Sequence, residues 1–347
     1  MFFTLIYLFS VEEIPMKKSV KYILIAVAAL LVAAVAILAV NAQNRADSEV
    51  IPEAGTSENA DRPTEFIQWE DRSKSVKRHI ETLLIIGTDE IEGRYETPPD
   101  DIEMYYNEAL CDLLIVLVLD NDAKTVTPFQ LNRDTMCEVP WISVNGKVGG
   151  TNVEQICYAH TYGSGSNDSC ENTVSAVSSL IFDAPIDHYI SFTMDAVPLL
   201  NDLVGGVTVT LPEDMPELGD EYTAGAEITL KGSAALNFVR YRNTALLDSN
   251  LPRMSRQRLY LEAFLPVARD SVEKNQDLVT QAFKVLDPYL CMDMTVNDIS
   301  DMVEKLCEYE ILPVITADGQ YRMGEKYAEF YVDNDSLYEC TVQAFCD

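Results

Sequence analysis

One uninterrupted apolar segment, Tyr22–Val40, constrains this chain of 347 residues more than any other feature. Its nineteen residues are Ala, Val, Ile and Leu with a single Tyr, and none is charged. A helix of that length, rising about 1.5 Å per residue, is about 28 Å long and matches the hydrocarbon core of a bilayer. Lys17, Lys18 and Lys21 precede it, and basic residues stay on the cytoplasmic side. We therefore expect a single-pass anchor in the lipid bilayer, with residues 1–21 in the cytoplasm and the main domain extracellular.

Two further interpretations concern this N-terminal region. A cleaved signal peptide is the alternative to an anchor, because Asn41–Gln43 is small and polar. The apolar run is longer than the usual 7–15-residue core of a signal peptide, which favours the anchor. Met16 followed by two lysines resembles the natural start of a bacterial export signal, which makes residues 1–15 a candidate start-site overcall.

The charge balance of the chain excludes one class of function. Asp and Glu number 56 and Lys and Arg number 25, which gives a formal net charge of −31. Nucleic-acid binding requires clustered basic residues to neutralise the phosphate backbone, so it is not expected here. Any anionic ligand must instead be bound by a local concentration of positive groups.

Eight cysteines form an even set, which permits up to four disulfides in an extracellular domain. The chain has no CxxC pair and only three His, so a structural zinc site is not expected. Cys340 and Cys346 are placed as a staple for a small C-terminal tail, but the pairing as a whole stays open. The eight are Cys111, Cys137, Cys157, Cys170, Cys291, Cys307, Cys340 and Cys346.

Composition divides the remainder of the chain into three parts. Residues 41–63 are rich in Glu, Asp, Ala, Ser and Pro without an apolar period, which is typical of a solvated tether. Residues 64–286 carry strand and helix patterns and form the main domain. The character of the sequence changes after that, and residues 287–347 are a C-terminal extension or a small subdomain.

Continuous apolar runs predict buried strands within the main domain. Leu113–Leu119 is almost wholly Leu, Ile and Val, as in a strand buried on both faces. Thr82–Gly87 is a second such run, and Thr125–Leu131 follows a turn as a hairpin partner. Since strands and helices mingle without a strict βαβ repeat, the fold class is α/β, with a mixed central β-sheet flanked by helices. The other expected elements are helices at Trp69–Ile80, Cys170–Phe182, Gly232–Val239 and Leu259–Val279, and strands at Asp187–Thr193 and Val204–Leu211.

Five of the arginines lie within nineteen residues, between positions 240 and 258. Arg240 and Arg242 alternate about a tyrosine, which on a strand places both on one side. Arg253 and Arg256 are three residues apart, which on a helix places them on one face. The planar guanidinium suits bidentate phosphate binding, so the set predicts an anion site. The alternative is a group of surface arginines that balances an acidic protein.

Charged residues also stand at the ends of the predicted buried strands. Asp89 follows the first strand, Asp112 begins the second and Arg133 follows the third. A carboxylate in such a place needs a compensating charge, which Mg²⁺ or an arginine can supply. Capping or turn aspartates, and a strand-end salt bridge in the stretch Arg133–Thr135, are the alternatives.

Seven short stretches, in order and over about residues 80–270, resemble the LytR-CpsA-Psr family of bacterial cell-wall proteins. Each stretch is weak alone, whereas the ordered set is specific. They are Leu83–Asp89, Asp112 with its strand, Asn132–Thr135, Pro185–Tyr189, Leu203–Val207, Val239–Arg242 and Arg253–Gln257.

The resemblance implies a function. Family members transfer an anionic glycopolymer, such as teichoic acid or a capsular-type polysaccharide, from a polyprenyl-pyrophosphate carrier to peptidoglycan. It also implies a magnesium-dependent phosphotransferase with an apolar pocket for the prenyl chain. The implied roles are Mg²⁺ ligands for Asp89 and Asp112, pyrophosphate binding for Arg133, Arg240, Arg242, Arg256, Gln257 and Lys147, and a general base for Asp248.

The chain departs from the family pattern at two places. Leu110 stands where family members commonly have an arginine, two residues before the second aspartate. Lys147 is followed by Val and Gly where the family commonly has Ile and Asn. Two alternatives therefore stay open. One is a hydrolase of the same pyrophosphate linkage, and the other is a non-catalytic envelope regulator that binds polyprenyl phosphate.

Overall fold

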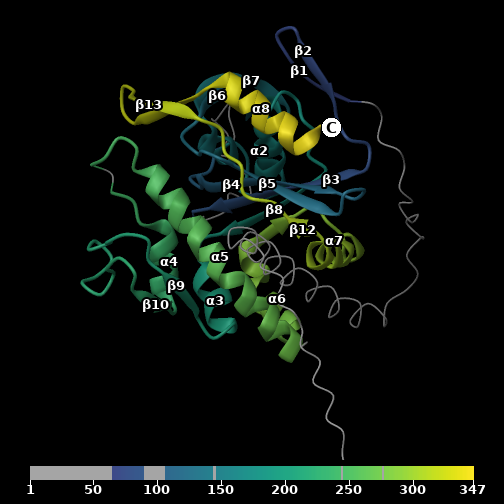
Figure 1. Cartoon of the computed structure of the whole chain (residues 1–347). Coiled ribbons are helices and arrows are strands. Elements are labelled where there is room, and N and C mark those ends of the chain that lie inside the picture. Colours follow the sequence, from purple (N-terminus) through teal and green to yellow (C-terminus); the bar gives the residue numbers. More distant parts are fainter. Residues whose placement is uncertain (1–64, 90–105, 144–145, 244, 276) are drawn as a thin grey trace, which may run out of the picture.

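The computed structural model describes residues 65–89, 106–143, 146–243, 245–275 and 277–347 (Figure 1). Three predictions lie outside the described residues: the start-site overcall at residues 1–15, the anchor at Tyr22–Val40 and the tether at residues 41–63. Within the described part of the chain, no helix combines the length and the apolar character needed to cross a bilayer.

A six-stranded mixed sheet forms the centre of the molecule, in the order β11-β8-β3-β4-β5-β12. β3 pairs antiparallel with β4 and parallel with β8, and β4 pairs antiparallel with β5. The strands are β3 (Ile80–Thr88), β4 (Cys111–Asp120), β5 (Thr125–Leu131), β8 (His188–Thr193), β11 (Leu290–Met292) and β12 (Glu310–Ile311). Four two-stranded sheets surround it: β1–β2 (Phe66–Trp69, Arg72–Ser75), β6–β7 (Met136–Ile142, Val148–Gln155), β9–β10 (Val207–Thr210, Glu227–Leu230) and β13–β14 (Gly319–Met323, Ala328–Val332).

The two central strands confirm the prediction from their apolar runs. All ten residues of β4 are buried, because helices and hairpins cover both faces of the sheet. Side chains alternate between the faces, so Leu83 and Ile85 join one hydrophobic cluster while Leu84 and Ile86 join the other. The hairpin from β4 to β5 and the strand β8 are also confirmed.

Helices form a layer on each side of the sheet (Figure 1). Helices α3 to α7 with β9–β10 pack on one face, and η1, α2 and α8 with β6–β7 pack on the other. The mixed α/β class with flanking helices is thereby confirmed. The helices are η1 (Ile156–Thr161), α2 (Asn167–Leu180), α3 (Ala196–Leu203), α4 (Ser233–Arg240), α5 (Asn250–Lys274), α6 (Asp277–Leu286), η2 (Asp287–Tyr289), α7 (Val296–Glu308) and α8 (Asn334–Phe345).

The C-terminal segment, residues 287–347, is built into the same sheet. It supplies both edge strands, because β11 pairs with β8 and β12 pairs with β5. Its last helix returns to the start of the described chain, where the Lys77 amide donates to the Phe345 carbonyl at 2.9 Å. The boundary at residue 286 is therefore not a break in the core.

The helix predicted at Trp69–Ile80 is wrong. The chain forms the β1–β2 hairpin there, with Glu70 at φ 53° in the turn. Ile67 is fully buried between two exposed neighbours, which is the two-residue period of a strand. Because β2 is a short run of polar residues, its sequence carries little strand signal.

Two expectations about the arginine-rich region also need correction. Arg240 is the last residue of α4, so Arg240 and Arg242 do not alternate on a strand. The helix expected at Leu259–Val279 begins nine residues earlier, at Asn250, and ends at Lys274 before the separate α6. Arg253 and Arg256 do share the buried face of the first turns of α5, as predicted.

The expected staple between Cys340 and Cys346 is absent, since both are free thiols in the described structure. Cys340 lies within α8, whereas Cys346 follows the last residue of that helix and its backbone forms a β-bridge with Val76. Four further cysteines are free thiols as well: Cys111, Cys137, Cys157 and Cys170.

Candidate active site

The ends of three strands meet at one edge of the central sheet. β3 and β5 end there and β4 begins there, since β4 runs antiparallel to both. The Asp89 amide donates to the Leu110 carbonyl at 3.1 Å, which ties the end of β3 to the start of β4. Arg133 and Asp134 lie just after β5, from which only Asn132 separates them. The strand pairing brings these strand-end residues to one edge of the sheet.

Asp112 lies between two buried arginines. One carboxylate oxygen accepts from Nη1 of Arg133, and the other accepts from Nη1 of Arg253 at 2.8 Å. The three side chains are between 3% and 9% exposed. Asp134 extends the group, because its Oδ1 lies 3.3 Å from Nε of Arg133 and 3.8 Å from Nη1 of Arg242. We call these five residues the arginine cluster.

The arginine cluster has more positive than negative charge, with three guanidinium groups against two carboxylates. Burial, and then the nearby charges of Arg133 and Arg242, lower the pKa of Arg253 to about 9. Its guanidinium still carries a proton at neutral pH. A bound anion would relieve this repulsion, and phosphate oxygens match the geometry of guanidinium forks.

A second Arg–Asp pair lies at the same edge but is open to solvent. Nη2 of Arg240 donates to Oδ1 of Asp89 at 2.9 Å, and the two side chains are 51% and 27% exposed. Arg240 ends α4, so its side chain is held at the edge by that helix. An exposed pair of this kind exchanges partners easily, since water screens the attraction between the charges.

Sequence reasoning missed residues that hold the arginine cluster. Oδ1 of Asn250 accepts from Nε and Nη2 of Arg253, at 3.0 and 2.7 Å. Its amide nitrogen donates to Oδ1 of Asn132 at 2.8 Å. Nη2 of Arg133 contacts the Cys157 sulfur at 3.0 Å. The spacing of Asn250 and Arg253, three residues apart on one helix, was the available signal.

Arg256 and Gln257 contact the end of α4 instead of the open edge. Nε of Arg256 donates to the Phe238 carbonyl at 3.0 Å, and its Nη2 donates to the Tyr241 carbonyl. Nε2 of Gln257 lies 3.5 Å from the Val239 carbonyl. These buried donors satisfy the last carbonyls of the helix, so they fix the place from which Arg240 extends.

Lys147 and Asp248 are not brought into the arginine cluster. Lys147 is exposed beside the start of β7, where its carbonyl accepts from the Ser143 amide at 2.9 Å. Asp248 is exposed on the turn before α5, and its carboxylate makes no hydrogen bond to another described residue. Their roles in phosphate binding and proton transfer stay predictions.

The donor set fits magnesium only in combination with a phosphate ligand. In the described part of the chain, no group of three or more His, Cys, Asp or Glu side chains could hold a metal ion. Asp89 and Asp112 stand at adjoining strand ends, and Mg²⁺ commonly takes one or two carboxylates with substrate phosphates. Both carboxylates already pair with arginines, so an ion would have to share them.

The family model that matches this chain is the LytR_cpsA_psr family, over residues 46–344. A relative is the polyisoprenyl-teichoic acid–peptidoglycan teichoic acid transferase TagU of Bacillus licheniformis, which is 24% identical over 96% of this chain and 97% of its own. Among solved structures, TagT of B. subtilis aligns with a TM-score of 0.54 at 19% identity, over 76% of this chain and 89% of its own. TagV of B. subtilis aligns with a TM-score of 0.54 at 20% identity, over 77% and 96%. These structural likenesses concern the fold.

Proposed function

The chain belongs to the LytR_cpsA_psr family, and from this premise we propose that it transfers a glycopolymer to peptidoglycan from a polyprenyl-pyrophosphate carrier. The polymer is of the teichoic-acid type, as in the name of the Bacillus licheniformis relative. The observation that carries the proposal is the arginine cluster, which is mostly buried and has an excess of positive charge at the edge where strands β3, β4 and β5 meet.

The arginines bind the pyrophosphate of the carrier. Arg133 is fixed by Asp112 and Asp134, so its guanidinium is already oriented when the substrate arrives. Arg240 and Arg242 flank it and are more exposed, which allows them to turn toward the phosphates. Such preoriented donors stabilise the charge that develops in a phosphoryl-transfer transition state, because they need little reorganisation.

Magnesium is proposed as the cofactor, with Asp89 and Asp112 as its protein ligands. When bound, the ion would neutralise phosphate charge and orient the group that is transferred. Support comes from the chemistry of the donors and from their adjoining strand ends. Asp89 is the more available of the two, since Asp112 uses both oxygens for arginines.

Transfer forms one bond and breaks another. The acceptor hydroxyl of peptidoglycan attacks the phosphorus next to the glycopolymer, the phosphoanhydride bond breaks, and polyprenyl phosphate leaves. Asp248 is the proposed general base for the hydroxyl proton. Its exposed position on the turn before α5 suits a base that must meet a large acceptor from solvent.

The membrane location is proposed from the sequence. Tyr22–Val40 would anchor the chain in the lipid bilayer, with the main domain extracellular. One spanning helix and a short tether keep a domain close to the surface at which a lipid-linked substrate presents its head group.

The test uses the full chain in detergent micelles, a polyprenyl-pyrophosphate-linked saccharide, peptidoglycan oligomers and magnesium, with products identified by mass spectrometry. We expect a phosphodiester-linked product that disappears with a chelator and falls about a hundredfold or more in Asp89→Ala. Release of saccharide phosphate that does not depend on the acceptor would support the hydrolase. Bound lipid with no product would support the regulator, with Leu110 in place of arginine as the leading cause.

A further inference from the structure

The hairpin β13–β14 from the C-terminal segment places a tyrosine against the arginine cluster. The Tyr321 hydroxyl accepts from Nδ2 of Asn132 at 2.9 Å and lies 3.1 Å from Oδ2 of Asp134. Burial and then the charge of Asp134 raise the pKa of the phenol. The hydroxyl is within donor distance of this carboxylate and, at 3.2 Å, of Oδ1 of Asn132.

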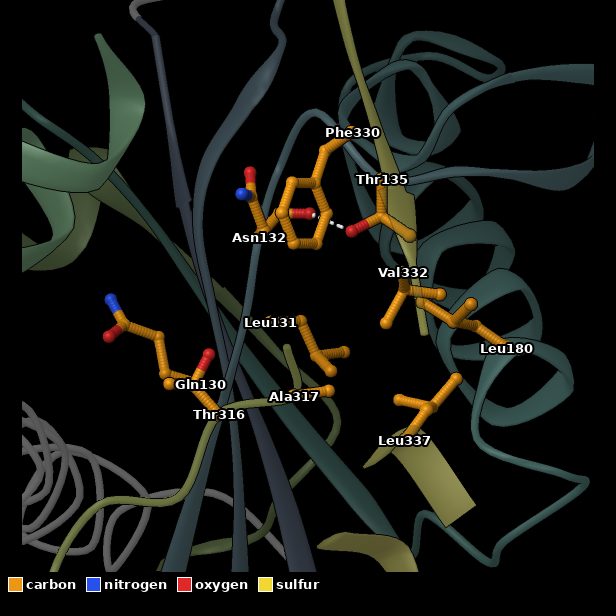
Figure 2. Close-up of a pocket in the computed structure, with 10 residues that line it drawn as sticks. All are labelled: Gln130, Leu131, Asn132, Thr135, Leu180, Thr316, Ala317, Phe330, Val332 and Leu337. Carbon is orange, nitrogen blue, oxygen red and sulfur yellow. Dashed lines mark hydrogen bonds between the residues drawn. The ribbon is translucent and has the colours of Figure 1, made fainter. Parts of the chain in front are cut away.

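The hairpin is attached to the site by contacts that do not involve this hydroxyl. The Phe330 amide donates to the Asp134 carbonyl at 2.9 Å, and Nε2 of Gln155 donates to the Ala328 carbonyl at 2.6 Å. Figure 2 shows Phe330 beside Asn132 in the small pocket between β5 and the C-terminal segment. The Tyr321 and Phe330 rings lie 5.1 Å apart, so the tyrosine ring is packed in place. Loss of the hydroxyl alone should leave the hairpin bound.

The hydroxyl closes a ring of polar contacts that includes the arginine cluster. Asn132 connects Tyr321 to the Asn250 amide, and Asp134 connects the tyrosine to Arg133. Every link in the ring is a buried or half-buried polar contact, where polar partners constrain one another strongly. In order, the ring is Tyr321, Asn132, Asn250, Arg253, Asp112, Arg133 and Asp134.

We propose that Tyr321 is a positioning residue for pyrophosphate binding, acting through Asp134. The phenol holds Oδ2 of Asp134, so only Oδ1 faces Arg133 and Arg242. Without the phenol, the carboxylate can rotate and present both oxygens to these arginines. It then competes with the phosphate for guanidinium donors. This inference rests on the proposed function, and it assigns a task to the segment after residue 286.

The binding experiment compares two tyrosines of the same hairpin in the full chain. The Tyr331 hydroxyl also bonds a carboxylate, Glu329 at 2.6 Å, but that pair is exposed. We expect Tyr321→Phe to weaken binding of geranylgeranyl pyrophosphate, used as the probe, about tenfold, as for a lost partner of a buried charged group. Tyr331→Phe should bind like the parent. Equal affinities for Tyr321→Phe and the parent would overturn the inference.

A double-mutant cycle separates positioning from a merely structural role. In an Asp134→Asn background the neutral amide cannot compete for both arginines as a carboxylate does. We expect Tyr321→Phe to change probe affinity there by less than about twofold, because the two residues act as one unit. The same tenfold loss in both backgrounds would contradict action through Asp134. Urea unfolding of Tyr321→Phe is the stability control. If it showed that this variant is partly unfolded under the conditions of the binding assay, the loss of probe affinity would be structural and would also contradict action through Asp134.

Binding of the probe also distinguishes this inference from the proposed function. A parent protein that binds the pyrophosphate but yields no product contradicts transfer, while the comparison of Tyr321→Phe and Tyr331→Phe still decides the role of Tyr321. A parent protein that forms product, with Tyr321→Phe binding unchanged, contradicts only the role of Tyr321. A parent that does not bind the probe contradicts both.

Discussion

Two Arg–Asp sets lie at the same edge of the sheet and differ mainly in burial. Asp112 lies within the protein between Arg133 and Arg253, with all three side chains at most 9% exposed. Asp89 and Arg240 form a single contact, and the arginine is 51% exposed. Residues of the same chemistry therefore have different roles. The buried set is a fixed framework, because each charge depends on its partners, and the exposed pair is free to exchange partners.

The largest expected difference is in stability. Arg253→Ala removes the donors to Oδ2 of Asp112 and Oδ1 of Asn250. We expect the free energy of unfolding in urea to fall by about 3–5 kcal/mol, as when one partner of a buried ion pair is lost. Lys274→Ala, which breaks an exposed pair with Asp270 four residues earlier in α5, is the control and should cost at most about 0.5 kcal/mol. Equal effects of the two would contradict the comparison.

For the exposed pair of Arg240 and Asp89, we expect a large effect on transfer and a small effect on stability. Arg240→Ala should lower the rate of transfer about a hundredfold or more, since a charged donor to the phosphates is lost. Its free energy of unfolding should change by less than about 1 kcal/mol, as for other exposed pairs. Transfer assays and urea unfolding on the same preparation provide both quantities. Near-parental transfer would show that Arg240 does not bind the phosphates.

A smaller effect is expected at a pair on another strand of the sheet. Nδ1 of His188, which begins β8, lies 3.5 Å from Oδ2 of Asp293, and this contact raises the pKa of His188. A raised pKa means that the pair stabilises the fold fully below the unfolded pKa, about 6.5, and that this contribution is lost as pH rises through the folded value.

The measurement is the free energy of unfolding between about pH 5.5 and 8.5, where histidine titrates. The parent should lose stability relative to His188→Asn as pH rises, by less than about 1 kcal/mol for a partly exposed pair. Parallel pH profiles for the two proteins would contradict the pair. Transfer should not follow this change, because His188 makes no contact with the arginine cluster.

The sequence predicted the parts of the fold whose signal is local. Leu113–Leu119 is apolar at every position, and only a strand covered on both faces suits such a run. The β1–β2 hairpin was missed because its second strand is short and polar. Arg240 and Arg242 were placed on a strand because they are two residues apart, which is the period of a strand. The same spacing is found here because α4 ends at Arg240, so the two arginines belong to different elements.

In the candidate site, too, the residues with a local sequence signal were predicted and those without one were not. Asp112 and Arg133 were found because each stands at the end of a recognisable strand. Tyr321 could not be found, since it is 189 residues from Asn132 in the sequence and joins it only through the pairing of the C-terminal segment. Asp248 was assigned as a general base from the family resemblance, and Asn250 was not singled out. The fold instead buries Asn250 against Arg253 and leaves Asp248 in solvent.

The hydrogen bond between Lys77 and Phe345 joins the first and the last parts of the described domain, so the domain can finish folding only after its C-terminal segment has been synthesised. Residues from the last turn of α8 close against the start of β3, and β11 and β12 form the two borders of the sheet only after most of the chain exists. A nascent chain therefore cannot finish this core until residues 290–346 have been synthesised. Removal of only the last few residues should expose the beginning of the domain to proteases. The exposed segment would be far in sequence from the residues that were removed.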